Sequence, residues 1–300
     1  MKQYLILTAA SLITICSANA QQLQNSSLYD LQGVFHNPSM AGVEKNNFVG
    51  FSYRTQWSGI TGSPKTATVF GSFKLPQYKM GVSGYLYSDK TGPTSRTGLQ
   101  LAVAKHIIFA NNSNLSLGIE ARVLQFAIDK AKLSQTLGND PVLGANSNNT
   151  KFDAGFGMSY TNEKFQLGAS VSQLTQSKLD FYSGNLSRSE SAKLYRHYYV
   201  HGKYLIDFDG TTTLTPNFLV TMMPNAPTEF QAGAKLEHNK LIWFGVGYRI
   251  HQGPMFSGGI NLMNKFTLGY AFDIYNAPLS TMTNGSMAHE FLIKYSFAGK

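Results

Sequence analysis

The chain has 300 residues, of which 43% are hydrophobic, 13% aromatic and only 14% charged, and its formal net charge is +9. This composition excludes an intrinsically disordered, collagen-like or disulfide-stapled protein. A low density of charge beside so many aromatic residues is unusual for the surface of a cytosolic enzyme. We therefore expect part of the surface to face something other than water.

Residues 1–20 have the pattern of a signal peptide. Lys2 is followed by an apolar stretch from Tyr4 to Ile15, and Ala18-Asn19-Ala20 fits the small-x-small rule for cleavage after residue 20. A lipoprotein site at Cys16 is less favoured because the bulky Ile15 precedes it. Cys16 is the single cysteine, so cleavage leaves no disulfide, catalytic thiol or cysteine metal site. No later apolar run reaches the roughly 18 residues of a membrane-spanning helix.

Residues 21–46 precede the first predicted strand and carry two turn signals. Asn37-Pro38 predicts a turn because proline fixes its backbone φ angle and asparagine can bond to its own backbone. Gly42 permits a second reversal of the chain.

Residues 47–300 alternate between apolar and polar side chains, as strands do when one face of a sheet is apolar and the other polar. In residues 265–275, for example, Phe266 and Leu268 lie on one face while Thr267 and Gly269 lie on the other. The pattern predicts about fourteen strands, near residues 47–57, 64–74, 79–88, 96–109, 114–127, 150–160, 164–173, 194–206, 211–222, 228–237, 240–250, 254–261, 265–275 and 287–297.

The predicted connections alternate in length. Every second one is a tight turn of polar or turn-forming residues, and the largest of the others run from Ile128 to Asn149, Leu174 to Lys193 and Asn276 to Ser286. Transmembrane β-barrels have short periplasmic turns and longer extracellular loops. We therefore expect an all-β, antiparallel β-barrel of the outer-membrane type, surrounded by outer-membrane lipid, with both termini in the periplasm. A secreted β-sandwich is the alternative, less favoured because glycine and charge gather on one face of the strands.

In a barrel of this size the polar faces line a lumen that is wider than side chains alone can fill. Residues 21–46 must then lie in the periplasm or fold into the lumen as a plug. On the first strand Arg54 and Gln56 are expected to point inward, whereas Tyr53 and Trp57 point outward, with Trp57 in an aromatic girdle. The charged and histidine residues expected to line the lumen are Arg54, Glu120, Arg122, Asp153, His197, His201, Lys203, Glu229, Lys235, Arg249, Asp273, Glu290 and Lys294.

Several spaced motifs resemble the PorP/SprF family of type IX secretion outer-membrane proteins. The motifs are His36-Asn37-Pro38-Ser39-Met40-Ala41-Gly42, Tyr53-Arg54-Thr55-Gln56-Trp57, Gly62-Ser63-Pro64-Lys65-Thr66, Ser88-Asp89-Lys90-Thr91-Gly92-Pro93 and the closing run from His289 to Phe297. The resemblance implies support for the secretion or cell-surface attachment of cargo with a C-terminal secretion domain, such as adhesins or gliding-motility proteins. It also implies contact with other secretion components, including periplasmic lipoproteins.

Closure of the barrel predicts a docking surface. The last strand pairs with the first, so we expect His289 and Glu290 to lie near Arg54, Gln56 and Trp57. We place Asp89 and Gly92-Pro93 in the second outer loop, on the same rim. The candidate partner-binding residues are these together with those of the N-terminal turns: Asn37, Pro38, Gly42, Arg54, Gln56, Trp57, Asp89, Gly92, Pro93, His289 and Glu290.

No catalytic, cofactor or metal site emerges from the motifs, and we expect no enzyme. His197 and His201 are roughly 13 Å apart on an extended strand, too far to share one metal ion. Gly155–Gly157 and Gly245–Gly247 precede no helix, so they are interpreted as glycines that ease strand curvature rather than as phosphate loops. Cations are dispersed along the strands, which disfavours nucleic acid as a partner. The alternatives to the secretion function are a general or anion-preferring porin and an outer-membrane hydrolase, for which no residue stands out.

Overall fold

The computed structural model describes residues 25–130, 132, 147–178, 193–224, 226–277, 279–282 and 287–299. The predicted signal peptide at residues 1–20 lies outside the described residues, as do parts of the three largest predicted loops. In the described ranges, no helix is long and apolar enough to cross a membrane.

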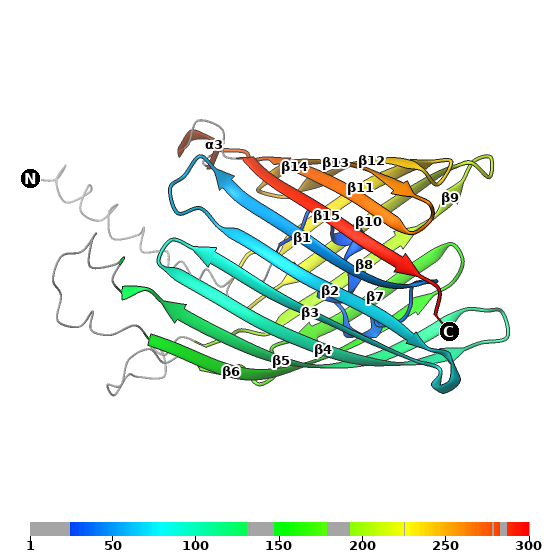
Figure 1. Ribbon diagram of the computed structural model, residues 1–300, viewed down its shortest axis with the longest axis horizontal. Helices are drawn as coiled ribbons and strands as arrows, with labels where there is room; N and C mark the ends of the chain where they lie inside the picture. Colours follow the sequence, from blue (N-terminus) through cyan, green and yellow to red (C-terminus); the bar gives the residue numbers. More distant parts are fainter. Residues whose placement is uncertain are drawn as a thin grey trace, which may run out of the picture.

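The described chain forms one antiparallel sheet that closes on itself (Figure 1). Closure occurs where β1 pairs with β15 and where β10 pairs with β11. Two strand segments, β8 and β9, are separated only by Leu205 and both pair with β10, so they act as one strand and the barrel has fourteen. The segments are β1 (Asn47–Ser58), β2 (Lys65–Leu75), β3 (Met80–Thr91), β4 (Thr94–Ile108), β5 (Asn114–Ile128), β6 (Ser147–Thr161), β7 (Phe165–Ser172), β8 (His197–Tyr204), β9 (Ile206–Asp207), β10 (Thr212–Met222), β11 (Glu229–His238), β12 (Ile242–Arg249), β13 (Gly253–Leu262), β14 (Phe266–Ile274) and β15 (Met287–Phe297).

The prediction of an antiparallel barrel of about fourteen strands is confirmed, and the alternation of side chains explains why. Apolar residues at every second position face outward: Leu101 is 59% exposed and Phe244 64% exposed. Their neighbours on the opposite face are buried, as with Ser116 at 0% and Glu290 at 1%. The outward face is the apolar band that a bilayer requires, and a register slip of one residue would place the charges in lipid.

The connections separate into two ends of the barrel. One end, here called the short-turn end, has the turns 76–79, 109–113, 162–164, 208–211, 239–241 and 263–265. The opposite end, called the long-loop end, has the connections 59–64, 92–93, 129–146, 173–196, 223–228, 250–252 and 275–286, the last of which includes α3 (Leu279–Met282). Asn47 pairs with Phe297, so the first and last strands begin and end together at the short-turn end.

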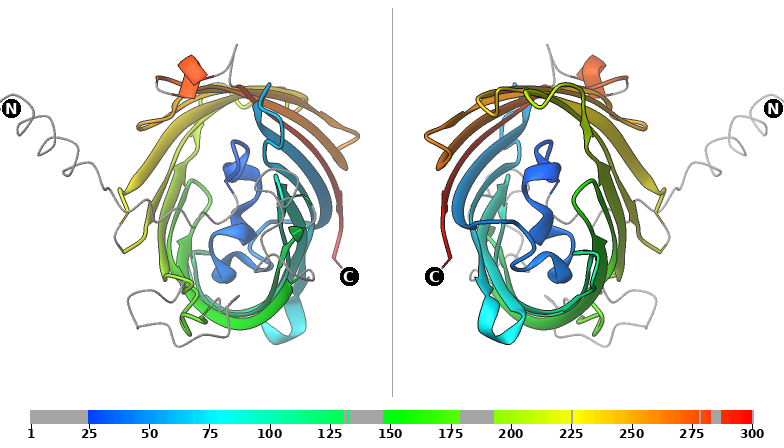
Figure 2. Two further views of the ribbon diagram at one scale, coloured as in Figure 1. Left: turned by 90° about the vertical axis from the view of Figure 1, so that its left-hand side faces the viewer. Right: turned by 90° about the vertical axis from the view of Figure 1, so that its right-hand side faces the viewer.

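Residues 25–46, here called the luminal segment, lie inside the barrel (Figure 2). The segment consists of three short 3₁₀ turns, η1 (Tyr29–Leu31), η2 (Gly33–Phe35) and η3 (Pro38–Met40). Proline at the first position of η3 suits the start of a helical turn. The Asn37 side chain caps this turn by accepting a hydrogen bond from the Ser39 backbone N–H at 2.9 Å.

An apolar cluster joins the luminal segment to the wall, which the expectation of a polar, glycine-rich lining missed. Leu28, Val34, Phe35 and Met40 are buried with inward aromatic residues of the strands. The Phe35 ring lies 5.1 Å from that of Phe70 between centroids. Each such fully buried side chain contributes about 1.5–3 kcal/mol relative to an exposed one. The segment is therefore docked by apolar burial as well as by polar contacts.

Candidate functional site

The contacts that hold the luminal segment in the barrel form the most elaborate polar arrangement in the described chain. Its first part is a cluster of charges on β1, β12, β14 and β15. Arg54 Nη2 lies 2.7 Å from Asp273 Oδ2, and Arg54 Nη1 lies 3.2 Å from Glu290 Oε2. Arg249 approaches the same Asp273 carboxylate at 3.5 Å. All four side chains are buried, so two cations and two anions neutralise one another inside the wall.

The luminal segment is bound to this cluster through two serines. The Ser26 hydroxyl donates to Glu290 at 2.7 Å, and the Ser27 backbone N–H donates to the same carboxylate at 2.8 Å. The Ser27 hydroxyl lies 2.6 Å from Asp273 Oδ1 and accepts from Arg54 Nη1 at 2.7 Å. Charge-assisted hydrogen bonds of this kind are stronger than neutral ones. The cluster therefore both braces the seam between β1 and β15 and holds the start of the segment.

The middle of the segment sits in a seat made of glycines. Asn37 Nδ2 donates to the Met158 carbonyl at 3.0 Å and lies 3.0 Å from His201 Nε2. A methyl group at Gly157 would overlap Asn37 Oδ1, and one at Gly118 would overlap the backbone of Pro38 and Ser39. Only residues without a side chain let η3 approach β5 and β6 this closely.

A second close approach occurs at Gly42. Its backbone N–H donates to the Ser72 hydroxyl at 2.8 Å, and its φ of +68° lies in the left-handed region that favours glycine. A methyl group on Gly81, opposite, would overlap the Ala41 carbonyl. The turn at Ala41-Gly42 therefore needs glycine on both of the surfaces that meet.

Two ion pairs bind the segment toward the short-turn end. Asp30 Oδ2 lies 2.8 Å from Lys235 Nζ, and Glu44 Oε2 lies 2.6 Å from Lys294 Nζ. Burial by itself would raise the pKa of the Asp30 carboxyl, but the charge and hydrogen bond of Lys235 outweigh it and hold that pKa below its usual range. Burial, with His201 and Arg122 adding repulsion, lowers the pKa of His36 to about 3. Asp30 is thus ionised and His36 neutral in the docked segment.

Comparison with known proteins identifies the family. Residues 17–295 match the family described as type IX secretion system membrane protein PorP/SprF. The chain belongs to the PorP/SprF family. This is a family of membrane proteins of a secretion system and not a class of enzymes. A search of curated proteins gives no significant match.

Solved structures similar to this PorP/SprF protein are outer-membrane barrels. The CymD monoaromatic hydrocarbon channel has a TM-score of 0.51 at 9% identity, covering 89% of this chain and 93% of that one. The toluene transporter TbuX of Ralstonia pickettii has a TM-score of 0.52 at 10% identity, covering 88% and 93%. At such low identity the similarity establishes the barrel fold alone.

The register confirms the juxtaposition expected across the seam in this family member. Arg54 is paired with Glu290, and Thr55 with His289. Arg54 and Glu290 face the lumen, where they are buried. His289 lies on the outward face, where its ring packs 5.3 Å from that of Phe272 and its Nδ1 lies 2.7 Å from the Tyr270 hydroxyl.

The placement of Asp89 in an outer loop was wrong. Asp89 belongs to β3 and points inward, where it accepts hydrogen bonds from Thr66 at 2.8 Å and from Arg96 Nη2 at 2.7 Å. The loop is shorter than expected because β3 and β4 extend to Thr91 and Thr94, leaving only Gly92-Pro93 between them. The Gly92 N–H donates to the Gly62 carbonyl at 2.8 Å, so this turn lies beside the β1–β2 connection on the same rim.

Trp57 stands where the alternation of β1 breaks down. Its φ is +56°, and the pairing of β1 with β15 shifts register between Thr55 and Ser58. Such a bulge re-aims the side chains that follow it, so the inward and outward assignments of Gln56 and Trp57 do not follow from counting. Both side chains are half-buried, and the Trp57 indole N–H is enclosed with no hydrogen-bond acceptor among the described residues. Partner contact at these positions stays a prediction.

The residues that sequence reasoning missed are those that contact the segment rather than those that carry charge. Gly118, Gly157 and Gly168 make its seat, and Ser72 accepts a hydrogen bond from the Gly42 N–H of the segment. Within the segment, the Ser27 hydroxyl donates to Asp273 of the wall. The interpretation of Gly155 and Gly157 as curvature glycines overlooked their contacts: methyl groups there would overlap Glu120 and Asn37. Asn37, Pro38 and Gly42, predicted as partner-binding residues, are buried against this seat.

The inward face holds a second charge cluster, which does not include Ser26 or Ser27. Arg122 Nε lies 2.7 Å from Glu120 Oε1, which also accepts from Ser172 at 2.9 Å, and Gln100 donates to the other oxygen of Glu120. No group of three or more potential metal-ligating side chains occurs in the part of the chain that the structure describes.

Proposed function

We propose that this protein is an outer-membrane component of the type IX secretion system that supports the secretion or cell-surface attachment of cargo with a C-terminal secretion domain. Adhesin and gliding-type proteins are the cargo class we expect. The family match over residues 17–295 carries this proposal. The protein acts by binding, since its buried polar groups form structural networks around the luminal segment.

The short-turn end faces the periplasm in this proposal. Short turns, together with the paired start of β1 and end of β15, are what outer-membrane barrels place on that side. Periplasmic lipoproteins of the secretion machine then meet the short turns, and cargo meets the long-loop end. Cargo docks there on the exposed Gly92, the neighbouring Pro93 and the β1–β15 seam. These positions were already predicted from the sequence as a docking surface.

The occupied lumen argues against a general or anion-preferring porin. Gln32, Asn37, Ser39 and Ala41 are completely buried inside the barrel. A diffusion channel requires a continuous aqueous path. The channel names of the similar structures do not alter this, because their similarity concerns the fold.

A clean deletion of the gene, followed by quantitative comparison of surface and secreted proteins, tests the proposal, with the restored gene as control. Loss of one or a few surface proteins that carry a C-terminal secretion domain identifies a cargo-specific component. Loss of all such cargo identifies a component that the whole machine needs. An unchanged set of exported proteins, together with steady ion conductance of the purified barrel in planar bilayers, would replace the proposal with the porin.

A further inference from the structure

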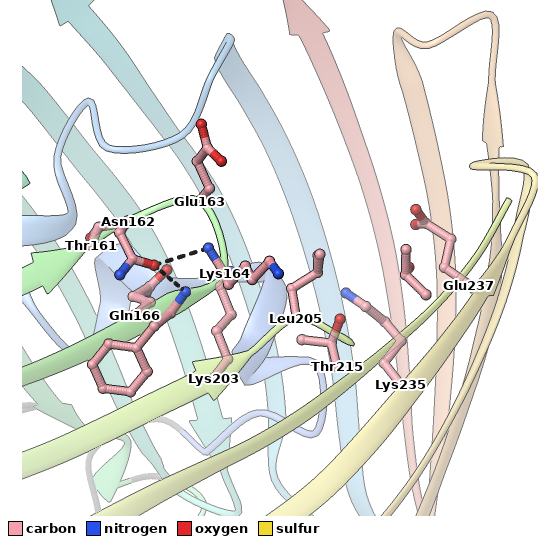
Figure 3. A pocket seen from close by; sticks show the side chains of 12 residues that line it. Thr161, Asn162, Glu163, Lys164, Gln166, Lys203, Leu205, Thr215, Lys235 and Glu237 are labelled. Carbon is pink, nitrogen blue, oxygen red and sulfur yellow. Dashed lines mark hydrogen bonds between the residues drawn. The ribbon is translucent and has the colours of Figure 1, made fainter. Parts of the chain in front are cut away.

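Two adjoining cavities open at the short-turn end, below the luminal segment. The larger has a volume of about 420 Å³ and includes Gly42 and Val43 of the segment in its wall. The smaller, shown in Figure 3, has a volume of about 220 Å³. Both are lined by Thr161 and Asn162, where β6 enters its turn to β7. We call the two cavities together the basic mouth.

The basic mouth carries cations without matching anions. Lys74 and Lys79 line the larger cavity, and Lys164 and Lys203 line the smaller; none of the four forms an ion pair within the described ranges. Lys235, which also lines the smaller cavity, is paired with Asp30. A cleft of one sign with walls of low dielectric constant concentrates its field on an incoming ion of opposite charge.

The carboxylates near these lysines have closer partners, although Glu44 attracts Lys74 and Lys203, and Asp30 attracts Lys203, at longer range. Glu237 accepts a hydrogen bond from Asn261 at 3.1 Å, and Glu44 is occupied by Lys294 at 2.6 Å. Glu163 lies in the exposed turn beside Lys164. Lys203 is the most enclosed of the unpaired cations: it is held between β7 and β10, opposite Gln166 and Asn217 in the pairing register.

Two buried polar atoms of residues that line the larger cavity, Asn114 Oδ1 and Thr161 Oγ1, have no hydrogen-bond partner among the described residues. Buried polar groups are almost always hydrogen-bonded. Their gathering at one cavity, beside two lysines, indicates a surface that is completed by a polar ligand.

Apolar side chains form the rest of the larger cavity. Val43, Pro76, Met80 and Ile108 line it. Lys74, His106 and Lys203 occupy inward positions of their strands, and the luminal segment contributes Gly42 and Val43 to the same wall, so a lipid in the surrounding bilayer does not reach this part of the mouth. A chain that brings both carboxylates and apolar side chains through the mouth satisfies the lysines and this apolar wall together.

We propose that the basic mouth binds an acidic peptide segment of a periplasmic partner protein, with carboxylates at Lys74 and Lys203 and an apolar side chain against Val43 and Met80. The proposal rests on the orientation proposed above, in which the short-turn end faces the periplasm. Charge-assisted hydrogen bonds from the lysines supply the affinity, and the apolar wall selects against small inorganic anions.

Binding of a fluorescent peptide that alternates glutamate and leucine, measured on the purified full chain in detergent, tests this site. We expect saturable binding that weakens at high salt, and loss of binding when glutamine replaces glutamate in the peptide. The double variant Lys74→Gln with Lys203→Gln should bind at least about tenfold more weakly, since each lost charge-assisted bond removes affinity. Lys265→Gln, an exposed lysine at the same end but outside the mouth, should bind like the parent.

Three results would overturn the site: equal affinity of the double variant, equal affinity of the glutamine peptide, or full displacement of the peptide by an equal concentration of inorganic phosphate. Lys79→Glu with Lys164→Glu, which changes only exposed side chains, should also weaken binding and guards against a folding defect in the first variant. The assay uses purified protein, so its failure rejects the site without touching the secretion proposal. Unchanged export in the deletion strain rejects the secretion proposal without touching the site.

Discussion

Arg54 joins β1 to carboxylates on β14 and β15 and to the luminal segment. It contacts Asp273 at 2.7 Å, Glu290 at 3.2 Å and the Ser27 hydroxyl at 2.7 Å. Neighbouring Arg249 reaches Asp273 only at 3.5 Å. Removing Arg54 would therefore leave two carboxylates in the wall with one weakly placed cation.

Arg54→Gln should destabilise the barrel by about 3 kcal/mol or more, because breaking a buried ion pair strands a charge. The free energy of unfolding in urea, measured from lipid vesicles, checks this. Lys132→Gln is the control: Lys132 pairs with Asp129 at 3.6 Å with both side chains exposed, at 64% and 39%, so the loss should stay below about 1 kcal/mol. An equal decrease in the free energy of unfolding in both variants would show that the buried cluster stabilises the barrel no more than an exposed ion pair does.

His36 gives the docked luminal segment a dependence on pH. Its pKa falls from 6.5 to about 3 on docking, because burial disfavours the imidazolium and His201 and Arg122 repel it. A released segment therefore binds a proton below about pH 6.5 that the docked segment cannot bind. Docking is fully stable above that pH and loses about 1.4 kcal/mol per pH unit as the pH falls from about 6 to about 4.

Hydrogen exchange of the backbone amides in residues 25–46, corrected for its intrinsic pH dependence, measures this loss. Protection should fall between pH 7 and pH 5 in the parent chain and fall less in His36→Gln, in which His201 still lies against Asn37 of the segment. Asp30 also stabilises docking less on acidification, because its pKa is lowered in the docked segment. That loss begins only below the ordinary pKa of an aspartate, which lies below the interval from pH 7 to pH 5. A parent chain whose protection does not change down to pH 5 would contradict the assignment of a neutral, buried His36.

At the scale of elements, the barrel wall and the luminal segment fit each other through glycine. On β5 and β6 the inward positions Gly118 and Gly157 are the places where η3 approaches the wall. The apolar cluster around Phe35 and Phe70 holds the neighbouring turn η2. The strands of the wall are paired to one another through the backbone, and none of these pairings involves the segment.

Gly118→Ala should release η3 while leaving the barrel assembled. The added methyl group would overlap the backbone of Pro38 and Ser39, and overpacking of this kind costs about 1–3 kcal/mol. Protease cleavage within residues 25–46 should become faster, while the heat-modifiable migration of the folded barrel on gels persists. Gly258→Ala is the control, since its methyl group would meet its nearest neighbour at 3.4 Å, an ordinary contact. Unchanged cleavage in Gly118→Ala would mean that η3 does not depend on this seat.

Strands were predictable because the bilayer imposes a strict period on them. Leu101, Phe244 and their like must face lipid and Glu120 and Asp273 must face the lumen, so the alternation is visible in the sequence. Asp89 was misplaced because the length of a hairpin is set by where pairing ends, and pairing of β3 with β4 continues to Thr91 and Thr94. The alternation of apolar and polar residues does not predict the bulge at Trp57 either.

The seat of the luminal segment could not be predicted for a different reason. Contacts such as Asn37 with His201, or Ser27 with Asp273, join residues that are far apart in the sequence and belong to no repeating pattern. Alternation places Gly118 and Gly157 on the inward face but does not say what lies against them. The turn at Asn37-Pro38 was visible locally, whereas its place inside the lumen depends on the whole closed barrel.

The whole molecule is a closed wall with an internal segment, and its two ends differ in chemistry. The short-turn end holds the basic mouth, with unpaired Lys74 and Lys203 in its cavities. The long-loop end holds the rim of Gly92-Pro93 and the β1–β2 connection. A barrel that spans the outer membrane exposes one end to the periplasm and the other to the cell exterior. The direction of insertion therefore decides which partner meets which end.

Single cysteines at the two ends test that direction. Thr61 lies in the β1–β2 connection at the long-loop end, and Lys265 lies in the β13–β14 turn at the short-turn end; both are exposed. The single native cysteine, Cys16, falls within the predicted signal peptide, whose cleavage would leave no competing thiol. A membrane-impermeant maleimide added to intact cells should label Thr61→Cys and spare Lys265→Cys, and both should react after the outer membrane is permeabilised. Labelling of Lys265→Cys alone in intact cells would show that the barrel is inserted in the opposite direction. The basic mouth would then face the cell exterior and could not bind a periplasmic partner.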